Sequence, residues 1–349
     1  MNRIMIASSR EGAGKTSIIV GIADVANKKI GYMKPFGDRL TYRKKRLWDY
    51  DSALMTKIFF LEENPEDMSL GFNHSKIMFM YNEQAIQEKL HEMALKTGSK
   101  KDILIIEAGM DLTYGISVFL DPMAVARTLG TGLIVVLAGN EGTVLDDLSL
   151  IKRSVKEVKA DFKGVIINKV PDVQDFKDTY GDTMDRMGIP VLGIVPFEEE
   201  LTYFNMQFLA EKMFAKIVAG ENGLRNIVHH VFVGAMSAEA ALKTPLFRKP
   251  KKLIITSGDR EDMILAAIES DTSGVILTNN ILPKSHLIAK ATLKKIPLLV
   301  VPYDTIHASR ELDKLEPLLT NQDVRKRDLL ADLVKRYVDV EKIIGNVVD

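Results

Sequence analysis

The sequence predicts an α/β protein with two domains: a parallel sheet with helices on both faces, followed by a second, smaller α/β domain. Short runs of Ile, Val and Leu recur along the 349 residues, and they alternate with segments of helical period. The runs are apolar without interruption, which is typical of strands that are covered on both sides. Alternation of strands and helices favours parallel neighbours with right-handed crossovers. A chain of this length favours about two domains.

The first series of elements is expected within residues 1–220. Its strands are predicted at 4–7, 29–33, 103–106, 133–137, 165–167 and 191–194, and its helices at 16–26, 51–61, 83–97, 143–158, 173–187 and 205–218. The Met- and Phe-rich segment 65–81 has no clean period. We expect it to pack against the domain or form a lid, with a partner surface as the alternative. The basic run 43–46 is expected to be a solvated turn.

A Gly-Glu-Asn-Gly cluster at 220–223 indicates a domain boundary, so the second domain is expected at 221–349. Its strands are predicted at 227–233, 252–255, 274–277 and 297–301, and its helices at 237–242, 260–269, 285–293 and 308–315. A charged C-terminal helix is expected at 324–344. It can pack on this domain or on a second subunit.

Composition excludes several classes of function. The chain has no Cys, which excludes disulfides, thiolate nucleophiles and Cys-based metal sites. Acidic and basic residues both number 47, and the zero net charge argues against a nucleic-acid partner. No apolar run reaches the length of a membrane span. We therefore expect a cytoplasmic protein with no membrane partner.

The strongest motif lies between the first predicted strand and the first predicted helix. Its residues 9–16, SREGAGKT, match G-x-x-x-x-G-K-[ST] except that Ser9 replaces the first Gly. Gly12 and Gly14 let backbone N–H groups turn toward phosphate oxygens, and the helix N-terminus favours the same anion. Lys15 can neutralise the β/γ oxygens and the Thr16 hydroxyl can bind Mg²⁺. This motif predicts a P-loop NTPase-type parallel sheet in the first domain.

A phosphate loop needs a carboxylate near the metal. Glu107 ends a hydrophobic strand at the edge where open α/β sheets bind ligands, with capping of the next turn as the alternative role. Asp51 stands at the start of a predicted helix and is either a metal ligand or an N-cap. Lys34, held by the following Pro, can reach a transferring phosphoryl group or an anionic substrate. Asn168 follows another strand, where its amide can read the edge of a base.

Taken in order, these segments resemble the dethiobiotin-synthetase branch of the deviant P-loop ATPases. The resemblance covers roughly residues 1–200 and rests on the loop, GYMKP at 31–35, DSAL at 51–54, residues 102–109, INK at 167–169 and PVLGIVP at 190–196. It implies bound ATP and Mg²⁺, a homodimer, and catalytic contacts from Lys15 and Lys34 to phosphate and to a reacting carboxyl or carbamate. The implied metal ligands are Thr16, Asp51 and Glu107, and Asn168 and Pro196 would border adenine. The predicted nucleotide-binding residues are Arg10, Gly12, Ala13, Gly14, Lys15, Thr16, Ser17, Asn168 and Pro196.

The chain departs from that family in two places, one in the phosphate loop and one on the substrate side. Ser8 stands where the family loop opens with Gly, and residues 108–118 replace a Gly-rich substrate loop. Residues 108–118 contain no Arg, Lys, Asn or Gln, the side chains that would hold a small substrate. This composition weakens the hypothesis that the protein is a synthetase acting on a small molecule.

The second half is similar to the DRTGG domain. Asp259 and Arg260 match the first two signature residues and Thr278 the third, while two Asn residues replace the paired glycines. Thr305 follows a later strand, and these loops are expected to hold an anion or nucleotide at one sheet edge. The alternative is that Asp259 caps its helix and Arg260 lies at the surface.

An ATPase domain followed by a DRTGG domain resembles the N-terminal region of long phosphotransacetylases. Because the chain ends at Asp349 without their catalytic domain, we expect no acetyl transfer. The leading hypothesis is a protein that binds and hydrolyses Mg-ATP, with a DRTGG module that holds a regulatory ligand. The alternatives are a synthetase that activates a carboxylate or carbamate for attack by an amine, and a non-catalytic nucleotide-sensing dimer.

Overall fold

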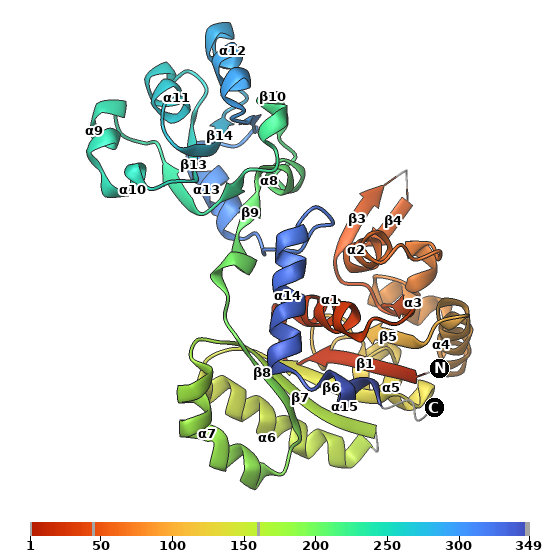
Figure 1. The fold of residues 1–349 in the computed structure, drawn as a ribbon. Helices are drawn as coiled ribbons and strands as arrows, with labels where there is room; N and C mark the ends of the chain where they lie inside the picture. The colour runs from red at the N-terminus through yellow and green to blue at the C-terminus, as the bar shows by residue number, and fades with distance from the viewer. Residues whose placement is uncertain (1, 44–45, 159–160, 346–349) are drawn as a thin grey trace. The chain divides into compact units, whose positions relative to one another are not determined.

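The computed structural model describes residues 2–43, 46–158 and 161–345, which form two compact units (Figure 1). The first unit contains residues 1–198 and 319–349, and the second contains 199–318. Lys44 and Lys45 of the expected basic turn lie outside the described residues. No helix in the described part of the chain combines the length and apolar character needed to cross a bilayer.

The first unit is built on a six-stranded sheet in which all neighbours are parallel, as predicted. In spatial order its strands are β2 (Ile30–Met33), β5 (Ile103–Glu107), β1 (Asn2–Ser8), β6 (Gly132–Leu137), β7 (Asp161–Val170) and β8 (Val191–Pro196). The carboxyl ends of β2, β5 and β1 therefore lie side by side. The loops that follow these three strands build the candidate site.

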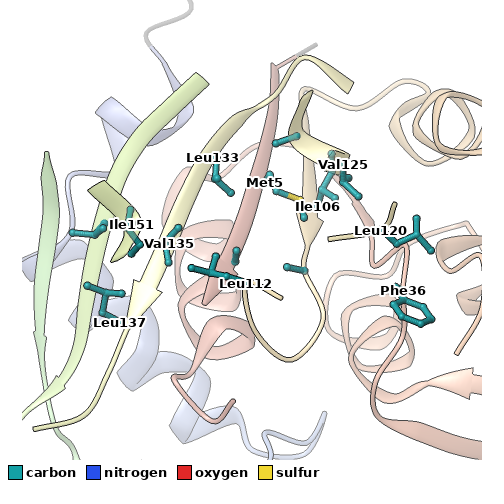
Figure 2. Packing of buried hydrophobic residues seen from close by; sticks show 14 of the residues in the cluster. Met5, Phe36, Ile106, Leu112, Leu120, Val125, Leu133, Val135, Leu137 and Ile151 are labelled. Carbon is teal, nitrogen blue, oxygen red and sulfur yellow. The ribbon is translucent and has the colours of Figure 1, made fainter. Parts of the chain in front are cut away.

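Helices cover both faces of this sheet. One face packs against α4 (Glu83–Gly98), α5 (Pro122–Leu129), α6 (Glu141–Val158) and α7 (Val173–Met187), and the other against α1 (Lys15–Ala26) and α14 (Val324–Tyr337). Figure 2 shows side chains of the first face, among them Met5 from β1, Val125 from α5 and Ile151 from α6. Because successive side chains of a strand point to opposite faces, Met5 belongs to this cluster while Ile4 and Ile6 serve the α1 face.

The C-terminal helix belongs to the first unit, which differs from its expected place in the second domain. Arg327 of α14 donates two hydrogen bonds to the carboxylate of Asp24 on α1, and its guanidinium lies 4.8 Å from the centroid of the Phe59 ring. Gly21 leaves room for α14, because a Cβ there would lie 2.4 Å from a methyl carbon of Val334. The predicted helix 324–344 is also divided, into α14 and α15 (Val340–Ile344).

The segment 65–81 packs on the first unit, as the favoured prediction had it. It forms a 3-10 turn η1 (Pro65–Met68) and the helix α3 (His74–Met80), and it follows a hairpin β3 (Leu40–Arg43) and β4 (Arg46–Asp49) and the helix α2 (Tyr50–Ile58). Ile77 and Met68 are buried. Residues 78–80 of α3 remain exposed, so the partner-surface alternative is untested for them.

The second unit has its own mostly parallel sheet. In spatial order its strands are β10 (Lys216–Ala219), β15 (Leu298–Val300), β14 (Thr272–Thr278), β13 (Lys252–Ser257) and β12 (His230–Val233), with β10 antiparallel at the edge. One face is covered by α9 (Ala238–Lys243), α10 (Pro245–Arg248), α11 (Glu261–Ile268) and α12 (Ser285–Lys294), and the other by α8 (Met206–Lys212) and α13 (Thr305–Asp313). A short pair, β9 (Phe204–Asn205) and β11 (Ile227–Val228), completes it.

Two predictions near the domain boundary are wrong. The predicted helix 205–218 ends at Lys212, and residues 216–219 instead pair with β15 as an edge strand. Gly220 has a φ of 67° and lies so close to β15 that a Cβ would fall 2.1 Å from the Ile296 carbonyl oxygen. The Gly-rich cluster is therefore a turn inside the second unit, where only a residue without a side chain fits.

Candidate functional site

The predicted phosphate loop connects β1 to α1. Gly12 and Gly14 have φ values of 71° and 92°, conformations that glycine adopts without strain. Gly14 is the N-cap of α1, and neither a side-chain cap nor an acidic residue occupies the first turn of this helix. The amide groups at the start of α1 and its positive dipole end therefore suit an anion.

Lys15 lies at the centre of the site with its side chain largely buried. Its Nζ donates to Ser8 Oγ at 2.9 Å and to the Met110 carbonyl oxygen at 3.1 Å. Burial lowers the pKa of Lys15, and the nearby charge of Glu107 opposes this effect. The ammonium group is thus held by two uncharged acceptors, one of which is the Ser that departs from the expected loop pattern.

The carboxylate of Glu107 is fully buried between two hydroxyl groups. Thr16 Oγ1 donates to Oε1 at 2.7 Å, and the Tyr32 hydroxyl donates to Oε2 at 2.8 Å. Burial, together with the charge of Asp51, raises the pKa of Glu107 to about 7. The structure therefore brings together two of the three predicted metal ligands. Tyr32 was not predicted, although it lies two residues before Lys34 in the GYMKP segment.

Lys34, the second predicted catalytic lysine, is completely buried in a cluster of carboxylates. Its Nζ donates to Asp51 Oδ2 at 2.6 Å and to Asp38 Oδ1, and it lies 3.7 Å from Asp49 Oδ2. Although burial opposes it, the charges of Asp51 and Asp49 hold the pKa of Lys34 well above its ordinary range. Asp38 and Asp49 were not predicted as site residues.

Asp49, not Asp51, is the N-cap of α2. Its Oδ1 accepts hydrogen bonds from the backbone N–H groups of Asp51 and Ser52, which corrects the N-cap alternative for Asp51. Burial raises the pKa of Asp49 to about 6. The pKa of Asp51 is lowered despite burial, chiefly by the charge of Lys34, and Arg39 Nη1 lies 3.6 Å from its carboxylate.

Two side chains at the end of β7 donate hydrogen bonds to the backbone of the phosphate loop. Asn168 Nδ2 donates to the Ala13 carbonyl oxygen at 2.9 Å, and Lys169 Nζ donates to the Gly12 carbonyl oxygen at 2.7 Å. The side-chain amide of Asn168 contacts the backbone of the phosphate loop, and its role in reading a base stays a prediction. Lys169 was not predicted.

The remaining predicted nucleotide residues lie around this loop. Arg10 donates from Nε and Nη2 to the Asp147 carboxylate of α6, at 3.0 and 2.9 Å. Ser17 lies in the first turn of α1, and Pro196 ends β8 opposite Val170 of β7. Their contacts with a nucleotide stay predictions.

Aromatic side chains fill the space where the loops after β2 and β5 meet. The ring of Tyr114 stacks on Phe36 with centroids 4.7 Å apart, and His74 meets both rings edge-on. The Tyr114 hydroxyl donates to the Gly37 carbonyl oxygen at 3.3 Å. A Cβ at Gly109 would lie 2.2 Å from the Tyr114 ring, so the loop after Glu107 is closed against this ring.

In the second unit, the predicted ligand residues separate into two groups. The hydroxyls of Thr278 and Thr305 lie 3.2 Å apart. Arg260 instead donates to the Asp262 carboxylate and to the Met236 carbonyl oxygen. Arg260 is the N-cap residue of α11 and this helix has no side-chain cap, so capping by Asp259 is not observed. The bond from Arg260 lowers the pKa of Asp262 to about 2.

The sheet order, the glycine loop and its lysine define the first unit as a P-loop NTPase-type domain. Residues 2–204 match an AAA domain (AAA_26), and residues 209–315 match the DRTGG domain. Because the first match covers more than half of the sequence, the chain belongs to this AAA domain family. It continues into a DRTGG domain, as expected.

The chain is similar in sequence to phosphate acetyltransferases that are about twice as long. The phosphate acetyltransferases of Synechocystis sp. and Pseudomonas aeruginosa are 25% and 24% identical over 98% of this chain, which covers 51% of each relative. The chain thus spans about half the length of these relatives. The cobyrinate a,c-diamide synthase of Listeria innocua is 26% identical over 56% of this chain and 40% of its own. The MinD cell division protein of Aquifex aeolicus matches 58% of this chain and 84% of its own at 16% identity, with a TM-score of 0.36.

Proposed function

We propose that the first unit binds Mg-ATP for phosphoryl transfer and that the DRTGG unit holds a regulatory ligand. The observation that carries this proposal is the contact between Thr16 and Glu107 beside the buried ammonium of Lys15, at the open N-terminus of α1. A hydroxyl and a carboxylate are oxygen donors of the kind that Mg²⁺ prefers. The pair Thr16 and Glu107 therefore fits this ion, whereas the carboxylate of Asp51 accepts a hydrogen bond from Lys34.

The described residues supply the main parts of a phosphoryl-transfer site. The loop amides and Lys15 would neutralise charge on the transferring phosphoryl group, which is the principal catalytic need of this reaction. Bound Mg²⁺ would supply further charge neutralisation at the β- and γ-phosphates. Lys15 can exchange its neutral acceptors for phosphate oxygens, which accept stronger, charge-assisted hydrogen bonds.

The proposal is tested by titrating ATP into the full chain by calorimetry, with and without Mg²⁺. Lys15→Ala is expected to weaken binding at least about tenfold, because it removes a charge-assisted contact. Glu107→Gln is expected to remove most of the Mg²⁺ dependence. Lys177→Ala, at an exposed position on α7, is the matched control. Wild-type affinity in Lys15→Ala would refute the assignment of the loop.

A further inference from the structure

We propose that Tyr32 is a positioning residue that makes the candidate metal site prefer Mg²⁺ to Ca²⁺. Its hydroxyl holds one oxygen of Glu107, which leaves the other oxygen for a metal ion. This inference rests on the proposed Mg-ATP function, and it adds a residue that determines which ion the site prefers. The hydrogen bond from the Tyr32 hydroxyl to the Glu107 carboxylate carries it.

The sheet places Tyr32 and Glu107 on the same face at neighbouring positions. Tyr32 lies in β2 opposite Ile105 of β5, and Glu107 follows two residues later as the last residue of that strand. Because side chains alternate along a strand, Ile105 and Glu107 point to the same face, and Tyr32 shares it. Both side chains are therefore positioned by strands, which hold a site more precisely than loops do.

The two oxygens of the Glu107 carboxylate have different partners. Oε1 accepts from the Thr16 hydroxyl, itself a candidate metal ligand, at 2.7 Å. Oε2 accepts from the Tyr32 hydroxyl at 2.8 Å. Neither Tyr32 nor Glu107 has exposed surface, so bulk solvent does not compete for this second bond. Oε1 is thus the oxygen that can serve an ion beside Thr16, while Oε2 is held on the side of β2.

A carboxylate with one available oxygen suits Mg²⁺ better than Ca²⁺. Mg²⁺ is the smaller ion, requires nearly ideal octahedral geometry and keeps several of its waters, so it uses few carboxylate oxygens of the protein. Ca²⁺ accepts more ligands in a flexible arrangement and can bind both oxygens of one carboxylate. Glu107 could offer both oxygens to an ion only by giving up the bond from Tyr32. Tyr32 therefore disfavours the larger ion without contacting it.

The test is calorimetric titration of ATP into the full chain with Mg²⁺, with Ca²⁺ and with neither ion. We expect Mg²⁺ to raise the ATP affinity of the wild type more than Ca²⁺ does. Tyr32→Phe keeps the ring and releases Oε2 of Glu107, so the preference for Mg²⁺ over Ca²⁺ should fall about tenfold or more, as is typical when the partner of a metal ligand is lost. ATP affinity without an ion should stay at the wild-type value.

Two further variants separate this role from a general effect on the fold. Tyr114→Phe is the matched control, because its hydroxyl donates to the Gly37 carbonyl oxygen and not to Glu107. It should keep the wild-type preference between the two ions. In a Glu107→Gln background, Tyr32→Phe should cause no further change in this preference, because residues that act through one another are not additive.

Three outcomes would overturn the inference. The first is an unchanged preference for Mg²⁺ in Tyr32→Phe, and the second is an equal loss of ATP affinity with and without an ion, which would indicate a purely structural role. The third is a wild type whose ATP affinity rises as much with Ca²⁺ as with Mg²⁺, a result that does not depend on how the variant folds. Each of these leaves the phosphate loop assigned to ATP. Failure of the wild type to bind ATP would instead defeat the proposed function.

Discussion

Lys34→Met tests whether the buried charge cluster holds the first unit together. Methionine has a similar length but no charge, so Asp38, Asp49 and Asp51 would lose the cation that two of them hydrogen-bond. Removing one partner of a buried ion pair typically costs about 3–5 kcal/mol, because the remaining charge stays desolvated. Near neutral pH we expect Lys34→Met to lose this much unfolding free energy. Such a loss is a large share of the stability of an ordinary domain.

The loss should shrink as the pH falls. In the wild type, the charge of Lys34 lowers the pKa of Asp51 against the effect of burial, so this carboxylate stabilises the fold above its ordinary pKa. That contribution is lost only below pH 3.8, the ordinary pKa of this side chain, as the pH falls through the lowered pKa of Asp51. In the variant no cation keeps the carboxylates ionised, so the folded state gains stability as they take up protons. Between about pH 7.5 and about pH 5 the contribution of Asp51 in the wild type is unchanged, so the difference in unfolding free energy narrows there through the gain of the variant.

The assay is urea unfolding at about pH 7.5 and about pH 5, a window over which buried carboxylates take up protons. Trp48 is the only Trp in the sequence and lies beside Asp49 in β4, so its fluorescence reports on the first unit. Lys152→Met, at an exposed position on α6, is the matched control. A deficit below about 1 kcal/mol, the range of a solvated surface pair, would refute the assignment of Lys34 to a buried structural role. An equal loss of unfolding free energy at both pH values would refute the expectation that protonation of the carboxylates relieves the variant.

Three further predictions concern single positions. Burial raises the pKa of Glu107 from 4.5 to about 7, so the folded state binds its proton more tightly. This proton contributes about 3 kcal/mol to the unfolding free energy, and the contribution should be lost as the pH rises from 4.5 to about 7. Urea titrations at several pH values should show this loss in the wild type but not in Glu107→Gln. The same dependence of unfolding free energy on pH in both proteins would contradict the shift. Gly14→Ala should cost about 1–2 kcal/mol and weaken ATP binding in calorimetry, because Gly14 has a φ of 92° and a Cβ would lie 2.5 Å from Asn168 Nδ2. Gly21→Ala should cost about 1–3 kcal/mol in urea unfolding by pushing α14 off α1, whereas Gly181→Ala, with open space around it, should be neutral or stabilising; equal effects would contradict the packing of α14.

The site was predictable where local sequence determines the chemistry. The glycine loop, its lysine and the following Thr form one continuous motif, and Glu107 ends a strand whose neighbour is β1. Tyr32 and Asp38 could not be found in this way. Tyr32 contacts Glu107, which is distant in sequence, and a Tyr inside an apolar strand has the same pattern as a core residue. Asp38 reaches Lys34 only through the fold of a loop.

The fold was predictable where apolar runs and helical segments alternate. It was not predictable where a segment has an apolar face but several surfaces could cover it. The C-terminal helix has this property: its pattern predicts a partner, and contacts such as those with Gly21 and Asp24 on α1 select which one. The stretch 216–219 has a similar ambiguity, because a short apolar run at the end of a helix also suits an edge strand.

The two lysines that the resemblance assigns jointly to phosphate and substrate differ in the charge of their partners. Lys15 is held by a hydroxyl and a carbonyl, so an incoming phosphate exchanges neutral acceptors for charged ones and gains stronger hydrogen bonds. Lys34 is held by carboxylates, so the same exchange would leave Asp51 and Asp38 buried without their cation. From these electrostatics we expect Lys15 to be available to a nucleotide and Lys34 to stay with its carboxylates.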